Sequence, residues 1–590
     1  MLKLSVFLRP YRGSVALVLA LALAQSLASL YLPRLLADIV DYGIVHGDTR
    51  QIMIYGALML LMALVGTACA VASSYFSSKT ASGFSRDVRS RVFDRVAHLS
   101  VHQFDRFGTA SLITRTTNDT TQIQQVLIMM MTMVITAPMM AIGGVVLSLS
   151  QDTRLARVLI AVIPIMAIVF FLIMRKAIPL FQQMQVKIDR LNLVLDEGLT
   201  GVRVIRAFDR NQHESRRFDA ANRDLTDNAI AVNRLVSMLM PAMFMMMNLT
   251  AVAIIWFGAI RIDAGQLQVG VMMSTLQYAV QILFSVFMVT AMFVTLPRAA
   301  ASAERINAVL DVMPDVNDPS VAKASAFAEA SADRSEGRPA GTSGGSVEFR
   351  NVTFQYPGAE EPALSSVSFI ARPGEVTAII GGTGSGKSTL AGLIPRFYDV
   401  NAGRVLVDGV DVREMRQEDL RARIGYVPQK AVLFSGTLAS NIRFGRESST
   451  DDEVQKAATI AQAAEFIDSK AEGYAASVAQ GGTNLSGGQK QRLAIARALV
   501  RNAGIYVFDD SFSALDFATD AKLRAALRTE TSHATVFIVS QRIGTVMNAD
   551  RIIVLDDGRV VGIGTHADLL ETCEVYREIA ESQASLEEVA

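Results

Sequence analysis

The strongest constraint on the fold is a set of six apolar stretches that all lie within about the first 310 of the 590 residues. A helix needs about 20 mostly apolar residues to cross the hydrocarbon core of a bilayer. The stretches cover roughly residues 14–36, 52–77, 127–150, 155–175, 236–260 and 271–296. The sequence therefore predicts an α-helical membrane domain with six transmembrane helices over residues 1–313.

The charges between these stretches indicate how the helices are oriented. Two long segments, at about residues 78–125 and 176–235, are rich in arginine. Basic residues accumulate in cytoplasmic loops, so we expect both segments, and the N-terminal Lys3, Arg9 and Arg12, inside the cell. An even number of spans then places both termini in the cytoplasm. No cleavable signal peptide is evident, and we expect a multi-pass protein of a bacterial inner (plasma) membrane, with an organelle membrane as the alternative.

Methionine and polar side chains within the predicted spans each allow two interpretations. Flexible methionines suit a promiscuous apolar binding surface, but lipid contact or packing between helices is the simpler interpretation. The methionines concerned are Met129, Met130, Met131, Met133, Met238, Met240, Met243, Met245, Met246 and Met247. Gln277, Tyr278 and Gln281 are candidates for a substrate cavity, although hydrogen bonds between helices explain them about as well.

The rest of the chain has the pattern of a linker and a soluble domain. Residues 314–345 are rich in Ala, Ser, Gly and Pro without a periodic apolar face, which predicts a linker. Residues 346–590 have the pattern of an α/β domain. The 56 basic and 56 acidic residues balance, which argues against a nucleic-acid partner. Cys69 and Cys573 are too few for a disulfide framework or a metal site.

A glycine-rich loop carries the clearest chemical signal of the soluble domain. The apolar run EVTAII leads into GGTGSGKST and a helical pattern follows, which is the P-loop spacing in its strand–loop–helix context. Glycines let backbone N–H groups surround phosphates, and the helix start favours negative charge. Lys387 is expected to reach the β- and γ-phosphates and Ser388 to hold Mg²⁺. The candidate nucleotide-binding residues are Gly381, Gly382, Thr383, Gly384, Ser385, Gly386, Lys387, Ser388 and Thr389.

Two downstream segments extend this candidate site. The run IYVFD ends at Asp509, which a parallel sheet would place beside the P-loop and near the Mg²⁺ ion. About 20 residues earlier, LSGGQ puts Ser486, Gly487, Gly488 and Gln489 at the start of a helix, a second arrangement that binds anions. Taken alone, the first segment is weak evidence and the second is an ordinary helix N-cap. Together with the P-loop they favour an ATP site.

The three segments GGTGSGKST, LSGGQKQR and YVFDDSFSALD, in this order and spacing, resemble the ATP-binding cassette (ABC) transporters. The resemblance extends into the membrane half, where QFDRFGTASLITRTTNDT and EGLTGVRVIRAF are similar to the two cytoplasmic loop segments of the exporter-type subgroup. It implies a P-loop nucleotide-binding domain of α/β type after the six helices. It also implies ATP and Mg²⁺ as cofactors, and a second half-transporter as partner.

Further roles follow from the resemblance position by position. Tyr356 matches the aromatic residue that stacks on adenine, or else packs on the sheet as a strand residue. Gln429 matches the glutamine that contacts Mg²⁺ and the attacking water, and Asp516 matches the residue that communicates across the dimer. Phe208 and its neighbours match the loop helix that docks on the opposite nucleotide-binding domain. In the family each ATP lies between the P-loop of one half and the LSGGQ of the other.

Two positions depart from the family pattern. Asp510 stands where the family has a glutamate that polarises the attacking water, and Gln541 stands where it has a histidine that contacts the γ-phosphate. The shorter carboxylate is pulled back by about 1 Å, and a misplacement of that size can cost about 100-fold in rate. A glutamine cannot take the charge of an imidazole. In addition, Ala479, Gln480, Gly481 and Gly482 stand where the family usually has Gly-Glu-Arg-Gly, so a charged pair is missing just before the LSGGQ segment, the family signature.

These departures resemble the subunit of a heterodimeric exporter whose own P-loop site is degenerate. We therefore expect ATP-driven export with slow hydrolysis at the chain's own site and a heterodimer rather than a homodimer, its LSGGQ completing the partner's hydrolytic site. Hydrophobic or amphipathic compounds, drug-like molecules or lipids, are the expected substrates. The alternatives are an ATP-binding regulatory membrane subunit with little hydrolysis and an exporter-fold importer of a metal chelate.

Overall fold

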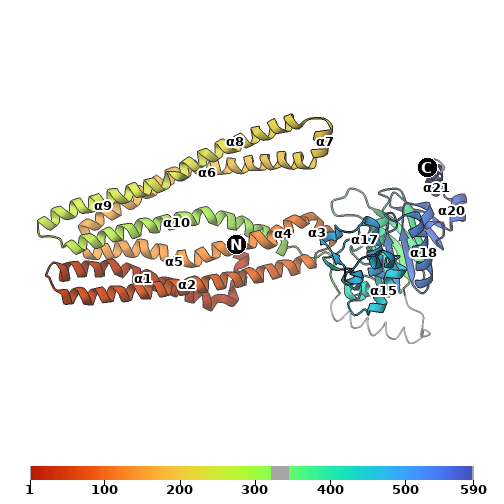
Figure 1. Cartoon of the computed structure of the whole chain (residues 1–590), viewed down its shortest axis with the longest axis horizontal. Coiled ribbons are helices and arrows are strands. Elements are labelled where there is room, and N and C mark those ends of the chain that lie inside the picture. Colours follow the sequence, from red (N-terminus) through yellow and green to blue (C-terminus); the bar gives the residue numbers. More distant parts are fainter. Residues whose placement is uncertain (1, 320–344, 588–590) are drawn as a thin grey trace. The chain divides into compact units, whose positions relative to one another are not determined.

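The computed structural model describes residues 2–319 and 345–587. Most of the predicted linker, residues 320–344, therefore lies outside the described residues. The chain divides into two compact units: Met1–Ala97 with Gly108–Val312, and His98–Phe107 with Met313–Ala590. The first is a bundle of long helices, and the second contains the sheets (Figure 1). Residues 98–107, from the first arginine-rich segment, thus group with the sheet-containing unit.

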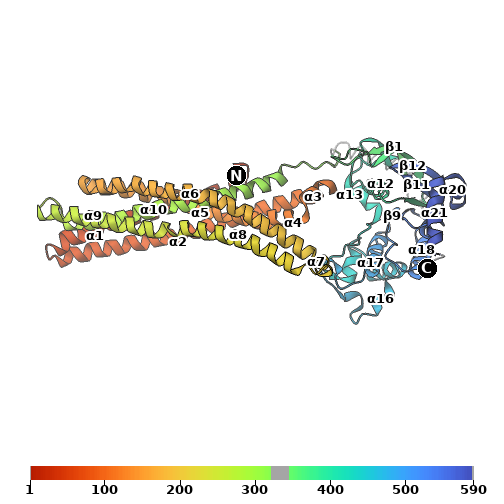
Figure 2. The same ribbon diagram turned by 90° about the horizontal axis from the view of Figure 1, so that it is seen from above.

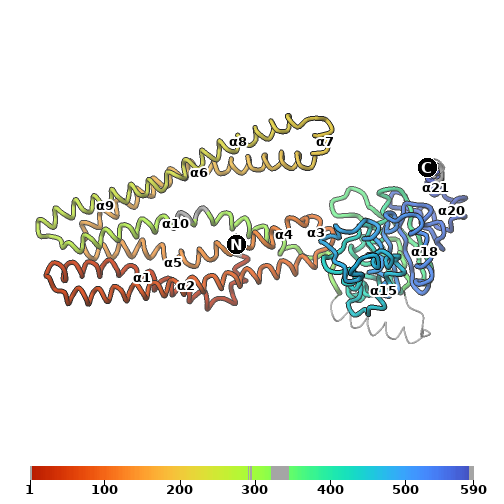
Figure 3. Tube along the Cα trace, viewed as in Figure 1, coloured from red at the N-terminus to blue at the C-terminus, as the bar shows by residue number. Residues whose placement is uncertain are grey.

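The first unit is helical throughout its described elements. Its α-helices are α1 (Arg12–Asp38), α2 (Thr49–Ala97), α4 (Thr109–Thr114), α5 (Thr120–Gln151), α6 (Thr153–Thr200), α7 (Val202–Ala207), α8 (Asn211–Ser237), α9 (Leu239–Asp263) and α10 (Val269–Leu310). A 3₁₀ helix, η1 (Leu2–Tyr11), precedes α1. Two π-helical segments, η2 (Ile39–Ile44) and η3 (Arg115–Asp119), continue α1 and α4. Helices α6 and α8 run side by side and are joined by α7 (Figure 3).

Among the described residues, six helical segments are long and apolar enough to cross a membrane. The prediction of six spans is therefore confirmed. The helices extend well beyond the apolar stretches: α2 has 49 residues and α6 has 48, where about 20 are enough to span the hydrocarbon.

Polar side chains inside the bundle pair with other helices. The Tyr278 hydroxyl donates to the Leu30 carbonyl oxygen at 3.0 Å, and Gln281 Nε2 donates to the Ser29 carbonyl oxygen at 3.2 Å. Both bonds join α10 to α1. Because an unpaired polar group in hydrocarbon is costly, these contacts explain Tyr278 and the amide nitrogen of Gln281, whose Oε1 is buried without a hydrogen-bond partner among the described residues. They favour the interpretation as bonds between helices over the one as cavity residues.

The second unit contains two larger sheets and a small two-stranded one. The first sheet has the order β2-β1-β4-β5 and is antiparallel. The second has the order β12-β11-β3-β10-β9-β6 and is parallel except for the edge strand β12. The strands are β1 (Val347–Phe354), β2 (Leu364–Ala371), β3 (Val376–Gly381), β4 (Ala402–Val407), β5 (Val410–Asp411), β6 (Ile424–Val427), β7 (Gly436–Thr437), β8 (Ser477–Val478), β9 (Ile505–Asp509), β10 (Thr535–Val539), β11 (Arg551–Asp556) and β12 (Arg559–Gly564).

The central strands are buried along their whole length, as strands covered on both faces must be. Every residue of β9 and β10 is buried. The helices are α3 (Val101–Phe107), α12 (Lys387–Leu393), α13 (Gln417–Ala422), α14 (Leu438–Arg443), α15 (Asp451–Ile460), α16 (Ala464–Asp468), α17 (Gly487–Leu499), α18 (Phe517–Glu530), α19 (Ile543–Val546), α20 (His566–Thr572) and α21 (Glu574–Glu587), with 3₁₀ turns η4 (Gly473–Ala475) and η5 (Gln480–Gly482). Figure 2 shows α12, α17 and α18 in this unit. The fold class, six membrane helices followed by an α/β domain, is as predicted.

Candidate functional site

Four neighbouring parallel strands, β3, β10, β9 and β6, bring the predicted site residues to one sheet edge. Each strand ends at this edge and is followed directly by a segment predicted to act on ATP. The P-loop follows β3, Gln541 follows β10, Asp509 ends β9, and Gln429 follows β6. The carboxyl edge of a parallel sheet is where α/β proteins bind ligands. The sheet order thus unites segments that lie up to 160 positions apart in the chain.

The P-loop needs a glycine at the turn that leads into its helix. Gly386 has φ +94°, and a Cβ placed on it would lie 2.6 Å from the carbonyl oxygen of Ala363. Positive φ is accessible to glycine at little cost. A Cβ on Gly382 or Gly384 would meet nothing within 4 Å, so the loop is open on that side. This combination of a strained turn and an open face fits a phosphate chain approaching the backbone.

The side chain of Lys387 lies inside this loop. Its ammonium group donates to the carbonyl oxygens of Gly381 at 2.9 Å and Gly382 at 2.5 Å, and only 7% of the residue is exposed. Burial lowers the pKa of Lys387, while the nearby carboxylates of Asp510 and Asp509 act in the opposite direction. A buried ammonium with carbonyl oxygens as its close partners is suited to an anionic ligand.

Ser388 and Asp509 are the oxygen donors expected to hold Mg²⁺. The Ser388 hydroxyl donates to Asp509 Oδ1 at 2.9 Å, and the Tyr426 hydroxyl donates to Asp509 Oδ2 at 3.4 Å. Burial raises the pKa of Asp509 and the charge of Asp510 adds to this, although the two hydrogen bonds oppose it. A hydroxyl beside a carboxylate fits Mg²⁺, which takes few protein ligands and completes its shell with phosphates and water. The described residues contain no cluster of three or more His, Cys, Asp or Glu side chains that could hold a metal ion.

Asp510 is held in an unusual backbone conformation next to Gln429. Its φ is +44°, in the left-handed region, and its N–H donates to the Val539 carbonyl oxygen of β10 at 3.0 Å. Gln429 Nε2 lies 3.4 Å from Asp510 Oδ2. The backbone of Asp510 is therefore fixed by the neighbouring strand, and the length of its side chain decides how far the carboxylate reaches.

Gln541 is exposed, and its backbone is bound by a residue that the sequence patterns did not indicate. Gln583, in α21, donates from Nε2 to the Gln541 carbonyl oxygen at 2.7 Å and accepts from the Ile543 N–H at 2.8 Å. One amide thus braces both sides of the turn after β10. No motif marks Gln583, because it lies 42 positions from its partner in an ordinary amphipathic helix.

Tyr356 packs against neighbouring aromatic rings beside the P-loop. Its ring packs edge-on against Phe354 at 4.8 Å and against Tyr398 at 5.5 Å between ring centroids. Its hydroxyl lies 2.9 Å from Thr389 Oγ1, in the first turn of the P-loop helix. The half-buried ring is thus held beside the P-loop by its neighbours.

The signature residues begin α17 as a capping box. Ser486 Oγ accepts from the Gln489 N–H at 3.3 Å, and Gln489 Oε1 accepts from the Ser486 N–H at 3.1 Å. Ser486 and Gly487 are exposed, while Gly488 and Gln489 are half-buried. Within residues 345–587, no hydrogen bond joins the signature to the P-loop of the same chain. Asp516 likewise caps a helix, accepting from the Thr519 N–H at 2.9 Å at the start of α18.

The first unit contains an apolar pocket among α6, α9 and α10. Its lining carries no charged side chain. The lining residues are Met166, Val169, Phe170, Ile173, Leu239, Ala242, Met243, Met246, Val286 and Phe287. Two of the methionines singled out in the fifth span thus face a pocket, whereas Met238, Met240 and Met245 are at least half exposed.

Two family models match the chain. Residues 15–286 match the model described as ABC transporter transmembrane region, and residues 364–513 match the model described as ABC transporter. An uncharacterized ABC transporter ATP-binding protein of Mycobacterium tuberculosis is 44% identical over 580 residues, covering 98% of this chain and 97% of the relative. A protein of the same description from Bacillus subtilis is 38% identical over 577 residues, with coverages of 98% and 97%.

The chain is also similar to a more distant relative and to a solved structure. An ATP-dependent lipid A-core flippase of Chromobacterium violaceum is 30% identical over 566 residues, covering 95% of this chain and 94% of the flippase. The structure of a bacterial Atm1-family ABC exporter with ATP bound superposes with a TM-score of 0.77 at 26% identity, covering 98% of both chains. The similarity therefore runs along nearly the whole polypeptide, through both the helical and the sheet-containing parts.

Proposed function

Because this chain belongs to the ABC transporter family and carries its membrane region and its ATPase domain in one polypeptide, we propose that it is the degenerate-site subunit of a heterodimeric exporter. It is an ABC exporter half-transporter that couples ATP hydrolysis to transport, and ABC half-transporters act as dimers. Two features distinguish this half in the proposed heterodimer. Hydrolysis at its own P-loop is slow, and its LSGGQ segment completes a faster site on a different partner chain.

The observation that carries the proposal is the position of Asp510. Its backbone is fixed to β10, so the carboxylate cannot advance by shifting the main chain. An aspartate in this place stops about one methylene, or roughly 1 Å, short of a glutamate, and such a misplacement can cost about 100-fold in rate. Gln541 adds to the loss, because an amide offers no positive charge to the γ-phosphate.

The geometry of the residues proposed to bind ATP supports tight binding of the nucleotide. ATP supplies the phosphate whose hydrolysis drives transport, and Mg²⁺ neutralises charge on the phosphate oxygens. Lys387 offers its ammonium group inside the P-loop, and Ser388 and Asp509 offer adjacent oxygens for the ion. Tyr356 presents a ring, braced by Tyr398, for the adenine. These residues hold ATP while Asp510 turns it over slowly, so that the site serves as a long-lived clamp.

The exposed LSGGQ segment is the part of this chain that completes the ATP site of the partner. Ser486 and Gly487 are open to solvent, and their helix start is a ready anion site. In the proposed heterodimer they face the γ-phosphate of the ATP held by the partner's P-loop. Phe208, 74% exposed at the end of α7, docks on the partner's ATPase domain, as its match to the family loop implies.

We further propose hydrophobic or amphipathic substrates, with lipids as the first class to test. The pocket lined by Phe170, Met243 and Phe287 is apolar, and burying uncharged carbon there is favourable whereas burying a charge is not. The flippases among the relatives act on a lipid. We propose that the ATPase domain and both termini lie on the cytoplasmic side of the plasma membrane, which the arginine-rich segments support.

The test is to purify the tagged chain from its native host in mild detergent and identify stoichiometric companions by mass spectrometry. We expect a second half-transporter. It should have Glu at the position that matches Asp510 and His at the position that matches Gln541. Substituting that glutamate by Gln is expected to abolish nearly all ATP turnover. A chain that purifies only with itself, or a pair that keeps its ATPase activity after the substitution, would rule out the asymmetric arrangement.

A homodimer would favour the second candidate, an ATP-gated regulatory subunit with little hydrolysis. Both of its sites would then carry Asp510 and Gln541. The intact Ser486–Gln489 capping box favours the exporter, because a sensor has no need of a signature that completes another site. ATP-dependent uptake of a fluorescent phospholipid into inverted vesicles, present for an exporter and absent for a regulator, separates the two.

A further inference from the structure

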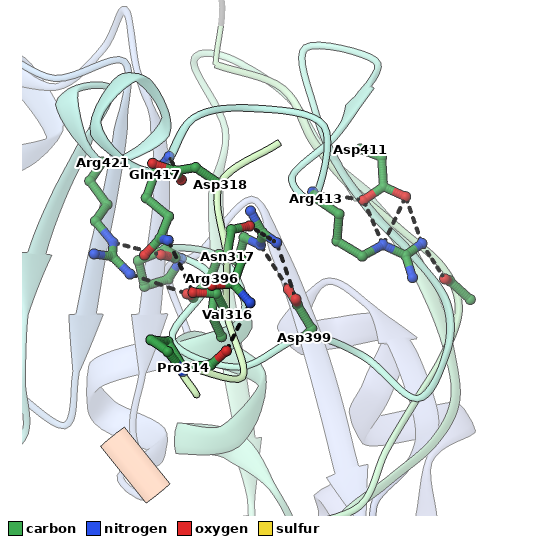
Figure 4. Close-up of polar contacts among 12 residues, drawn as sticks. Pro314, Val316, Asn317, Asp318, Arg396, Asp399, Asp411, Arg413, Gln417 and Arg421 are labelled. Carbon is green, nitrogen blue, oxygen red and sulfur yellow. Dashed lines mark hydrogen bonds and ion pairs between the residues drawn. The ribbon is translucent and has the colours of Figure 1, made fainter. Parts of the chain in front are cut away.

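The segment that follows α10 lies against the ATPase domain and is bound there by side chains on both sides. Residues 313–319, here called the strap, belong to the same unit as the sheets. Figure 4 shows Pro314, Val316, Asn317 and Asp318 of the strap beside Arg396 and Gln417. Val316 is only 8% exposed. The strap is therefore an ordered part of the domain surface.

Arg396 anchors the strap from directly behind the P-loop helix. It lies three positions after α12, has φ +54° and is 3% exposed. Its Nε and Nη2 bind the Asp399 carboxylate at 2.7 and 3.1 Å, and Nη2 also donates to the Asn317 carbonyl oxygen at 3.1 Å. Two parallel hydrogen bonds to a carboxylate hold a buried guanidinium in one orientation. The strap carbonyl is thus held at a fixed distance from the end of the helix that begins with Lys387.

A second anchor joins the strap to α13. Asp318 Oδ1 accepts from the Gln417 N–H at 2.9 Å, at the first residue of that helix. Gln417 Nε2 donates back to the Val316 carbonyl oxygen at 3.4 Å. Arg421, one turn along α13, donates to the carbonyl oxygens of Pro395 and Arg396 at 3.2 and 3.3 Å. The two anchors therefore belong to one connected network.

The opposite side of the strap is bound by α3, from the first cytoplasmic loop. Gln103 is 9% exposed; its Nε2 donates to the Met313 carbonyl oxygen at 2.8 Å, and its Oε1 accepts from the Ser100 N–H at 3.2 Å. The Ser100 hydroxyl lies 3.4 Å from Asp315 Oδ2. These contacts explain why residues 98–107 group with the ATPase domain although they come from the membrane half of the sequence.

We propose that Arg396 is a positioning residue that couples the P-loop helix to the first cytoplasmic loop through the strap. Gln103 fixes α3 to one side of the strap, and Arg396 fixes the other side to the end of α12. A shift of α12 on nucleotide binding then moves α3 without any direct contact between the two helices. Arg396 touches no nucleotide in this role; it sets how much of the movement at the P-loop reaches the loop.

The test compares two arginine variants of the complete transporter by hydrogen–deuterium exchange with and without the non-hydrolysable analogue AMP-PNP. Arg396→Lys keeps the charge beside Asp399 but loses the fork that reaches Asn317. Arg413→Lys is the matched control, because Arg413 forms a similar fork on Asp411 at the same domain but does not touch the strap (Figure 4). In the parent and the control, AMP-PNP is expected to slow exchange at both the P-loop and α3, by about tenfold or more.

In Arg396→Lys the slowing at the P-loop is expected to remain while that at α3 falls below about twofold. Gln103→Met keeps the side-chain volume but loses the bond to Met313. It should likewise keep the slowing at the P-loop and lose most of the slowing at α3. The ratio of transport to ATP hydrolysis, measured with a fluorescent phospholipid, should fall in both variants. Equal protection of α3 by AMP-PNP in the parent and in both variants would overturn the proposal, whatever the partner and substrate of the transporter prove to be.

Discussion

The Ser388 hydroxyl donates a hydrogen bond to Asp509 Oδ1 over 2.9 Å, and so joins the first turn of the P-loop helix to the end of β9. The two residues are 121 positions apart in the chain. Because β10 lies between β3 and β9 in the sheet, the P-loop helix and the end of β9 meet across one intervening strand. The Asp509 carboxylate, proposed to lie beside Mg²⁺, is buried, and burying its charge costs the nucleotide-free protein free energy.

That cost gives a prediction about stability. Burial, and then Asp510, hold the pKa of Asp509 above its usual 3.8. The stabilisation from protonated Asp509 is fully present below its unfolded pKa and is lost as pH rises through the raised pKa of the folded state. Asp509→Asn should therefore raise the unfolding temperature of the nucleotide-free protein at pH 8, by about 2–4 °C, and abolish ATP hydrolysis. The gain should shrink as the pH falls towards 5 in thermal scans.

Asp411→Asn is the control, and it should change the unfolding temperature in the opposite direction. Burial alone would raise the pKa of Asp411, but the hydrogen bonds from Arg413 outweigh it and lower that pKa. Stability from this group is present above its unfolded pKa and lost as pH falls. The control should thus unfold at a lower temperature than the parent at pH 8. An Asp509→Asn protein that is less stable than the parent at that pH would contradict the assignment.

If hydrolysis at this chain's own P-loop is slow, as proposed, then lengthening one side chain and introducing one imidazole should speed it. Asp510→Glu combined with Gln541→His brings the carboxylate about 1 Å closer to the attacking water and returns a cation to the γ-phosphate. We expect turnover at this chain's P-loop to rise about 10- to 100-fold. The measurement is ATPase activity in a heterodimer whose partner carries a Glu→Gln substitution, so that only this site contributes. Unchanged activity would locate the deficiency elsewhere.

A partly buried ion pair in the membrane unit should be costly to break. Asp152 Oδ1 accepts from the Arg154 and Leu155 N–H groups at the start of α6 and from Arg261 Nη1 at 2.6 Å. Asp152→Ala removes the cap and leaves a guanidinium that is only 17% exposed without its partner. We expect a loss of about 3–5 kcal/mol in unfolding free energy, measured by denaturant titration in micelles.

Asp48→Ala is the control that removes a helix cap without breaking an ion pair. Asp48 accepts from the Arg50 and Gln51 N–H groups at 2.9 and 3.2 Å and is exposed, so it is a helix cap alone. Its removal should cost about 1 kcal/mol. Similar losses for the two variants would mean that the pair with Arg261 contributes nothing.

The ring of Tyr356, rather than its hydroxyl, should determine affinity for ATP. Stacking of a base on an aromatic side chain is worth about 1–3 kcal/mol, so Tyr356→Ala should weaken binding of a fluorescent ATP analogue by about 5- to 150-fold. Tyr356→Phe loses only the contact with Thr389 Oγ1 and should change affinity by less than about twofold. Equal losses in both variants would show that the hydroxyl acts through the P-loop helix instead.

The sequence alone determined the features that depend on local spacing. Runs of about 20 apolar residues predict membrane helices because no other element pairs its backbone within one segment in lipid. The spacing of the P-loop predicts its strand–loop–helix context, since Gly386 requires a left-handed backbone at a fixed place before Lys387. The order of these signals was enough to predict the fold class.

Only the tertiary structure decided which distant groups meet. Tyr278 bonds to the Leu30 carbonyl 248 positions away, so a residue that the sequence offered as a cavity candidate serves to join two helices. Gln583 braces the turn at Gln541 without any motif to mark it, and Gln103, although it begins a loop segment with a family pattern, carries no sign in the sequence that it binds the strap at Met313. The reason is physical: a hydrogen bond to a backbone carbonyl constrains the position of its acceptor but not its residue type, so it leaves no pattern in the sequence.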